Sequence, residues 1–155
     1  MTTDQLFLLG KIQEAIDKFN LENSYLMDND LNERTIYPHL AESIKEKLAD
    51  TDYSDYVYDV EYNRGFNLDD SAIKTLDGNN ISIDIVFHKR GHDDIIGYDN
   101  LICIELKKAT NREGYIEDEN RLSKLTNQKY KFNYMLGVMI SITTKLEIKS
   151  VFFLN

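Results

Sequence analysis

Charged side chains interrupt two neighbouring apolar segments at a spacing that could form a metal site. Asp84 lies within the segment 81–87, and Glu105 and Lys107 end the apolar run that begins at Leu101. Alternate residues of a strand face the same way, so Glu105 and Lys107 share a face, and Asp84 can converge with them if the two strands pair. An unpaired charge is costly to bury there. Two carboxylates beside an ammonium make physical sense around a divalent cation.

The Glu-x-Lys spacing by itself is weak evidence for such a site. The same spacing recurs at Glu147-Ile-Lys149, so it arises readily in a chain with 29% charged residues. Context separates the two occurrences, because Glu105 follows a second apolar segment that carries Asp84, whereas the apolar stretch before Glu147 carries no acid. Acids inside apolar strands are expensive unless they have a partner or a task. A salt-bridged strand end therefore remains the alternative to a metal site.

A third acid, Glu33, lies at the start of a helix that we predict over residues 32–48, with Asn32 as its N-cap. At about 100° per residue, Leu40 and Ile44 each fall within about 20° of Glu33 around the helix axis. This carboxylate thus lies within the apolar stripe and would point at the sheet that carries Asp84 and Glu105. The alternative is a terminal acid that the helix dipole favours. The sequence leaves both interpretations open.

The hydrophobic pattern predicts an α/β (α+β) fold in the order α-α-β-β-β-α-β-β, with helices packed against a mixed sheet. Residues 65–80 are predicted to be a polar excursion closed by a turn at 77–80. The predicted helices span residues 4–20, 32–48 and 118–129, and the predicted strands span residues 55–63, 81–87, 101–108, 134–142 and 146–154.

The length of 155 residues permits one domain with a hydrophobic core. Its 42% apolar and 29% charged residues are typical of a globular protein. We expect a single domain over 1–155, with an N-terminal helix and connector at 1–31, a core at 32–142 and a C-terminal strand at 143–155.

Cysteine content and net charge limit the cellular compartments and the binding partners that we expect for this chain. No apolar run has the length of a membrane span, and the one cysteine, Cys103, lies inside an apolar segment, so we expect a cytoplasmic protein without membrane association. The net charge of −9 weighs against a tight, nonspecific DNA-binding protein, because such affinity rests on Lys and Arg contacts. A local basic patch remains open.

The order of a helix with Glu, a strand, a strand with Asp, a strand with Glu-x-Lys, a helix and a strand resembles the PD-(D/E)XK nuclease superfamily, which has the restriction-endonuclease-like fold. The resemblance covers residues 32–142, and it is closest to a group of small, mostly uncharacterised bacterial members. Ile83 stands where the motif has proline. Four segments carry the resemblance: Asn32-Glu-Arg34, Glu61-Tyr-Asn-Arg64, Asp84-Ile-Val-Phe-His88-Lys-Arg-Gly91 and Asn100-Leu-Ile-Cys-Ile-Glu-Leu-Lys-Lys108.

This resemblance implies a metal-dependent hydrolase that cleaves phosphodiester bonds of nucleic acid. We favour DNA over RNA as the substrate. Asp84 and Glu105 would bind Mg²⁺ or Mn²⁺, and the backbone carbonyl of Leu106 could complete the set of ligands. Lys107 would orient the attacking water or help to deprotonate it. Glu33 would be an auxiliary ligand or would hold a metal-bound water.

Three further residues are weaker candidates for substrate binding. Arg64 could hold a phosphate, although a structural ion pair is the favoured interpretation. Glu61 could face the site, or it could pair with Arg64 or Arg34. Lys124, on the predicted helix after the Glu-x-Lys strand, could face a substrate, or it could lie in solvent.

Other functions remain open alongside a nuclease. A non-catalytic interaction or regulatory protein could keep the same fold, which the acidic charge and the short chain favour. A third possibility is a nuclease subunit that takes its DNA contacts from a protein partner or from its own homodimer.

Overall fold

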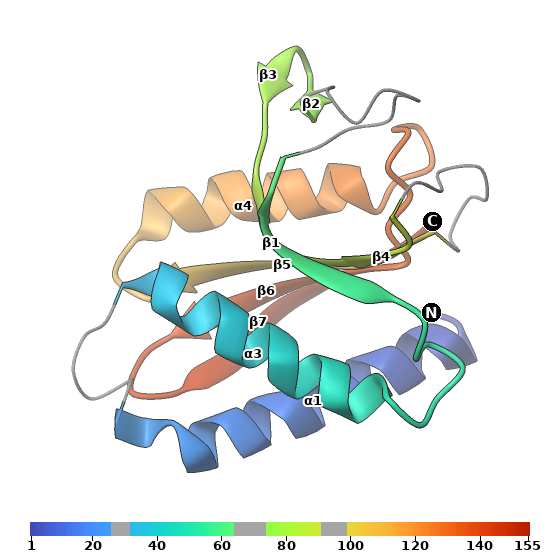
Figure 1. The fold of residues 1–155 in the computed structure, drawn as a ribbon. Helices are drawn as coiled ribbons and strands as arrows, with labels where there is room; N and C mark the ends of the chain where they lie inside the picture. The colour runs from blue at the N-terminus through green and yellow to red at the C-terminus, as the bar shows by residue number, and fades with distance from the viewer. Residues whose placement is uncertain (26–31, 64–73, 91–98) are drawn as a thin grey trace.

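The computed structural model describes residues 1–25, 32–63, 74–90 and 99–155, which form a mixed sheet with helices on both faces (Figure 1). Five strands follow the order β1-β4-β5-β6-β7, with α1 and α3 on one face and α4 on the other. The predicted α+β class is confirmed. The helices are α1 (Thr3–Glu22), α3 (Glu33–Leu48) and α4 (Arg112–Leu125), and the strands are β1 (Val57–Tyr62), β2 (Thr75–Leu76), β3 (Asn79–Asn80), β4 (Ile83–His88), β5 (Asn100–Lys108), β6 (Leu136–Ile142) and β7 (Leu146–Phe153).

The central strand β5 positions the charged residues. It pairs antiparallel with β4 and parallel with β6, whereas β1 with β4 and β6 with β7 are antiparallel pairs. Residues from Leu101 to Leu106 are all buried, because helices cover both faces of this strand. A parallel pair needs a crossover, and α4 supplies it. The helix that follows the Glu-x-Lys segment is thereby held against the same strand.

Buried apolar side chains form two clusters, one on each face of the sheet. The first lies between the sheet and α1 with α3, and the second lies between the sheet and α4. Neighbouring strand residues divide between them, as the alternation of a strand requires: Phe87 joins the first cluster and Val86 the second. Cys103 belongs to the second cluster as a buried free thiol.

The two N-terminal helices form where the sequence predicts them. The predicted N-cap is confirmed, since the Asn32 side chain accepts a hydrogen bond from the Arg34 amide. Helix α1 begins with a capping box in which Thr2 and Gln5 exchange hydrogen bonds. None of the helices in the described ranges is long and apolar enough to cross a membrane.

Two sequence predictions need correction. Helix α4 spans Arg112–Leu125 rather than 118–129, because the Asn111 side chain accepts the Gly114 amide and so begins the helix earlier than its apolar residues indicate. The polar excursion also contains a short hairpin, β2–β3, which the predicted order of elements omits. Its turn at Asp77-Gly78 is as predicted, with both residues in the left-handed region at φ 52° and 80°.

The N-cap of α4 can be tested by substitution. Asn111→Ala removes the acceptor of the Gly114 amide, and we expect the free energy of unfolding to fall by about 1 kcal/mol. Urea denaturation measures the change. Asn120→Ala is the matched control, because this exposed asparagine lies inside the same helix, and it should change stability by less than about 0.5 kcal/mol. Equal effects of the two substitutions would contradict the capping role.

Candidate functional site

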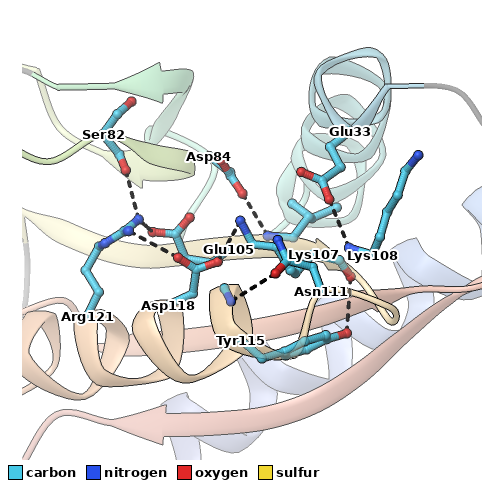
Figure 2. A network of polar contacts seen from close by, with 12 residues as sticks. Glu33, Ser82, Asp84, Glu105, Lys107, Lys108, Asn111, Tyr115, Asp118 and Arg121 are labelled. Atoms are coloured by element: carbon cyan, nitrogen blue, oxygen red, sulfur yellow. Dashed lines mark hydrogen bonds and ion pairs between the residues drawn. The ribbon is translucent and has the colours of Figure 1, made fainter.

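Strand β4 parts from β5 beyond the Ile85–Ile104 pair, while β6 stays paired with β5 as far as Lys108. The edge of β5 that β4 leaves unpaired is hydrogen-bonded to carboxylates instead of to a strand. The Leu106 amide donates to Asp84 Oδ2 at 2.8 Å, and the Lys108 amide donates to Glu33 Oε1 at 2.9 Å. Figure 2 shows these acids on the side of β5 away from β6. The opening thus gathers two of the predicted site residues at one strand end.

Asp84 lies between α3 and the Glu105 side chain of β5. Its carboxyl accepts a hydrogen bond from the Leu106 amide. Burial raises the pKa of Asp84, and the Leu106 amide, the nearby Tyr37 and Glu105 side chains and the charge of Lys107 oppose this rise only partly. The pKa of Tyr37 is also raised, by its burial and by the nearby Asp84 charge. Asp84 and Glu105 therefore converge as the sequence predicted.

Glu105 is the most deeply buried acid of this group, with 1% of its surface exposed. Its pKa is raised well above the usual range, first by burial and then by the negative charge of Asp84. Arg121 of α4 opposes this rise by donating to Glu105 Oε1 at 2.6 Å. Two buried carboxyls this close together are costly to ionise, and the single contact from Arg121 compensates them only in part.

Lys107 lies on the same face of β5 as Glu105 and pairs with a residue of α4. Its ammonium is 3.0 Å from Asp118 Oδ2, and Asp118 is 3% exposed. Burial lowers the pKa of Lys107, but the bond to Asp118 and the charges of Glu33 and Asp84 outweigh burial and raise it. Lys107 is therefore held as an ammonium, which suits a group that orients a water more than one that removes its proton.

Sequence reasoning missed Asp118 and Arg121, which complete the cluster (Figure 2). Arg121 donates to the Ser82 carbonyl at 3.2 Å as well as to Glu105, and its other terminal nitrogen lies 3.1 Å from Asp118 Oδ1. A signal for Asp118 was available. It stands four residues before Leu122 and seven before Leu125, which places an acid on the apolar stripe of α4, as Glu33 is on α3.

For the other two predicted metal ligands, Glu33 and the Leu106 carbonyl, the structure agrees with only part of the prediction. Glu33 faces the sheet, as its position on the apolar stripe predicted, and its carboxylate binds the Lys108 amide at the opened edge. Leu106 lies between Glu105 and Lys107, and its amide, rather than its carbonyl, contacts Asp84. The ligand role of the Leu106 carbonyl stays a prediction.

The weaker substrate candidates are engaged elsewhere or lie outside the described residues. Glu61 pairs with Arg34 at 2.7 Å, which was one of the two partners the sequence left open. Lys124 pairs with Asp77 in the β2–β3 turn and so ties the hairpin to α4. Arg64 lies outside the described residues.

No family model, curated protein or solved structure matches this chain. Within the described ranges, no group of three or more His, Cys, Asp or Glu side chains is positioned to hold a metal ion. The donor set at the opened edge still suits Mg²⁺ or Mn²⁺, because Mg²⁺ is often bound by one or two carboxylates together with water and substrate phosphate.

Burial of Glu105 predicts a pH dependence of stability in protein kept free of metal with a chelator. The pKa of Glu105 is higher in the folded chain than in the unfolded chain, so the free energy of unfolding falls as pH rises through the interval between them. Glu105→Gln has no ionisable group at this position, so it removes this pH-dependent loss of stability. We expect the variant to be more stable than wild type at about pH 8 by on the order of 1 kcal/mol, with the difference shrinking toward about pH 4.

Denaturant unfolding at several pH values measures this difference. Glu117→Gln is the matched control, because Glu117 is an exposed acid of α4 and its neutralisation should leave the pH profile unchanged. A Glu105→Gln variant less stable than wild type at every pH would show that the ion pair with Arg121 outweighs the cost of burying Glu105.

Proposed function

We propose that this protein is a metal-dependent hydrolase of phosphodiester bonds in nucleic acid, with a PD-(D/E)XK-type site. One observation carries the proposal: the carboxyls of Asp84 and Glu105 meet, with raised pKa values, at the point where β4 leaves β5. Lys107 lies two residues after Glu105 on β5, and its ammonium is attracted by the negative charge of Asp84. The geometry supports the roles that the resemblance to this superfamily implies.

Each residue of the site has a role in the proposed reaction. Asp84 and Glu105 would hold Mg²⁺ or Mn²⁺, with the Leu106 carbonyl as a further oxygen ligand. The cation, when bound, supplies positive charge that stabilises the charge developing on the phosphate. Lys107 orients the attacking water. Hydrolysis forms a bond from the water oxygen to phosphorus and breaks the bond to the leaving sugar oxygen, which takes up a proton.

DNA is the favoured substrate, and a cytoplasmic location fits a chain whose one cysteine is a buried free thiol. The acidic net charge implies that few phosphates are contacted, because each phosphate contact usually requires a cationic side chain. Weak intrinsic DNA affinity is consistent with a homodimer or a protein partner that adds contacts.

A second candidate function has its own support. The Lys107 and Arg121 cations are both paired with acids of the protein itself, Asp118 and Glu105. Such internal pairing also suits a non-catalytic interaction or regulatory protein, in which the cluster joins α4 to the sheet. Calorimetry separates the two functions, because only the hydrolase should bind Mg²⁺ or Mn²⁺.

Cleavage assays with a matched internal control test the hydrolase. Wild type should cut DNA in Mg²⁺ or Mn²⁺, and Glu105→Gln or Lys107→Met should lower the rate by about 100-fold or more. The second Glu-x-Lys, on β7, is the control, because Glu147 is exposed and pairs with Lys145. Glu147→Gln and Lys149→Met should leave the rate within about two-fold of wild type.

Single- and double-stranded DNA and RNA are assayed in parallel to identify the substrate. Loss of activity in the β7 variants but not in the β5 variants would place the site elsewhere. A wild type that cuts none of these substrates and binds neither metal would favour the interaction protein.

A further inference from the structure

Arg121 lies where a bound metal ion would compete for the same carboxylate. Its guanidinium donates to Glu105 Oε1 at 2.6 Å, and Glu105 is a proposed metal ligand. A divalent cation and a guanidinium on one buried carboxylate repel each other strongly, because few water molecules separate them. Metal binding should therefore weaken the bond between Arg121 and Glu105.

The remaining contacts of Arg121 would keep it at the site after that bond weakens. Asp118 lies three residues earlier on α4, and its Oδ1 is 3.1 Å from a terminal nitrogen of Arg121. The other carboxylate oxygen of Asp118 forms an ion pair with Lys107. About a quarter of the Arg121 side chain is exposed, so part of it is accessible to a bound molecule. A fork of N–H donors matches the paired oxygens of a phosphate, to which Arg binds bidentately.

We propose that Arg121 is a substrate-positioning residue that exchanges Glu105 for a phosphate of the nucleic acid when a divalent cation binds. Before binding, Arg121 partly neutralises the buried acids. After binding, the phosphate supplies the negative charge that Arg121 loses at Glu105, and Asp118 keeps the guanidinium oriented. Metal and substrate thereby bind cooperatively. This inference rests on the proposed hydrolysis of nucleic acid.

Arg121→Gln tests the exchange, with Lys124→Gln as the matched control. Both substitutions remove one positive charge from α4, but Lys124 pairs with Asp77 of the hairpin turn rather than with a site acid. Calorimetry with Mn²⁺ should show affinity about five-fold or more higher for Arg121→Gln than for wild type. Lys124→Gln should stay within about two-fold of wild type, because removal of a more distant charge has a screened effect.

A second measurement follows binding of fluorescent DNA in Ca²⁺, through fluorescence anisotropy. Arg121→Gln should bind this DNA about five-fold or more weakly, although it binds metal more tightly. Arg121→Lys keeps the charge without the fork, so it should bind Mn²⁺ as wild type does and DNA more weakly. A purely structural role for Arg121 would not give these opposite changes.

A measurement on wild type serves if Arg121→Gln fails to fold. The Nε–H signal of Arg121 in the NMR spectrum should shift when Mg²⁺ is added, whereas that of Arg90, which pairs with Asp59, should not. Unchanged Mn²⁺ affinity in a folded Arg121→Gln variant, or an unshifted Arg121 signal, overturns the exchange even if wild type cleaves DNA. A wild type that binds Mn²⁺ but neither binds nor cleaves nucleic acid overturns the proposed function and the transfer to phosphate. In that case, the Mn²⁺ affinities of Arg121→Gln and wild type still show whether Arg121 and the metal compete for Glu105.

Discussion

The placement of one carboxylate, Glu105, on the central strand constrains the structure around it. Helices cover both faces of β5, so this acid has almost no access to water, and an ionised carboxyl in that position requires compensating charge. Arg121 supplies it from α4, and Asp118 orients Arg121 while it also compensates Lys107. The charged residues of β5 and α4 thus form one chain of ion pairs, from Lys107 through Asp118 and Arg121 to Glu105.

The divergence of β4 from β5 adds a second constraint at the same point. Backbone amides at a strand edge need acceptors, and water reaches a covered sheet poorly. Asp84 and Glu33 accept hydrogen bonds from the amides of Leu106 and Lys108, so each acid has a structural role that requires no metal. These hydrogen bonds fix the position of Asp84 beside Glu105, which is the kind of preorganisation that a metal site requires.

Local pattern predicted the parts of the site that lie on regular elements. Alternation along β5 placed Glu105 and Lys107 on one face, and helical periodicity aimed Glu33 at the sheet. The pairing of Glu105 with Arg121 could not be deduced in this way, because it depends on how the crossover helix is rotated against the sheet. The start of α4 was also missed, since its first turn is polar and the cap of Asn111, rather than an apolar stripe, determines where it begins.

The parallel pairing of β5 with β6 through α4 has a consequence for how the chain folds. Glu105 and Arg121 are separated by 16 positions, whereas the contacts that tie α1 to the far end of the chain, such as Gln5 to Met135, span 130. The entropy lost in closing a loop grows with the logarithm of its length, so the crossover unit closes at a lower entropic cost than the termini. We therefore expect β5 and α4, with the pair of Glu105 and Arg121, to come together earlier in folding than α1 docks.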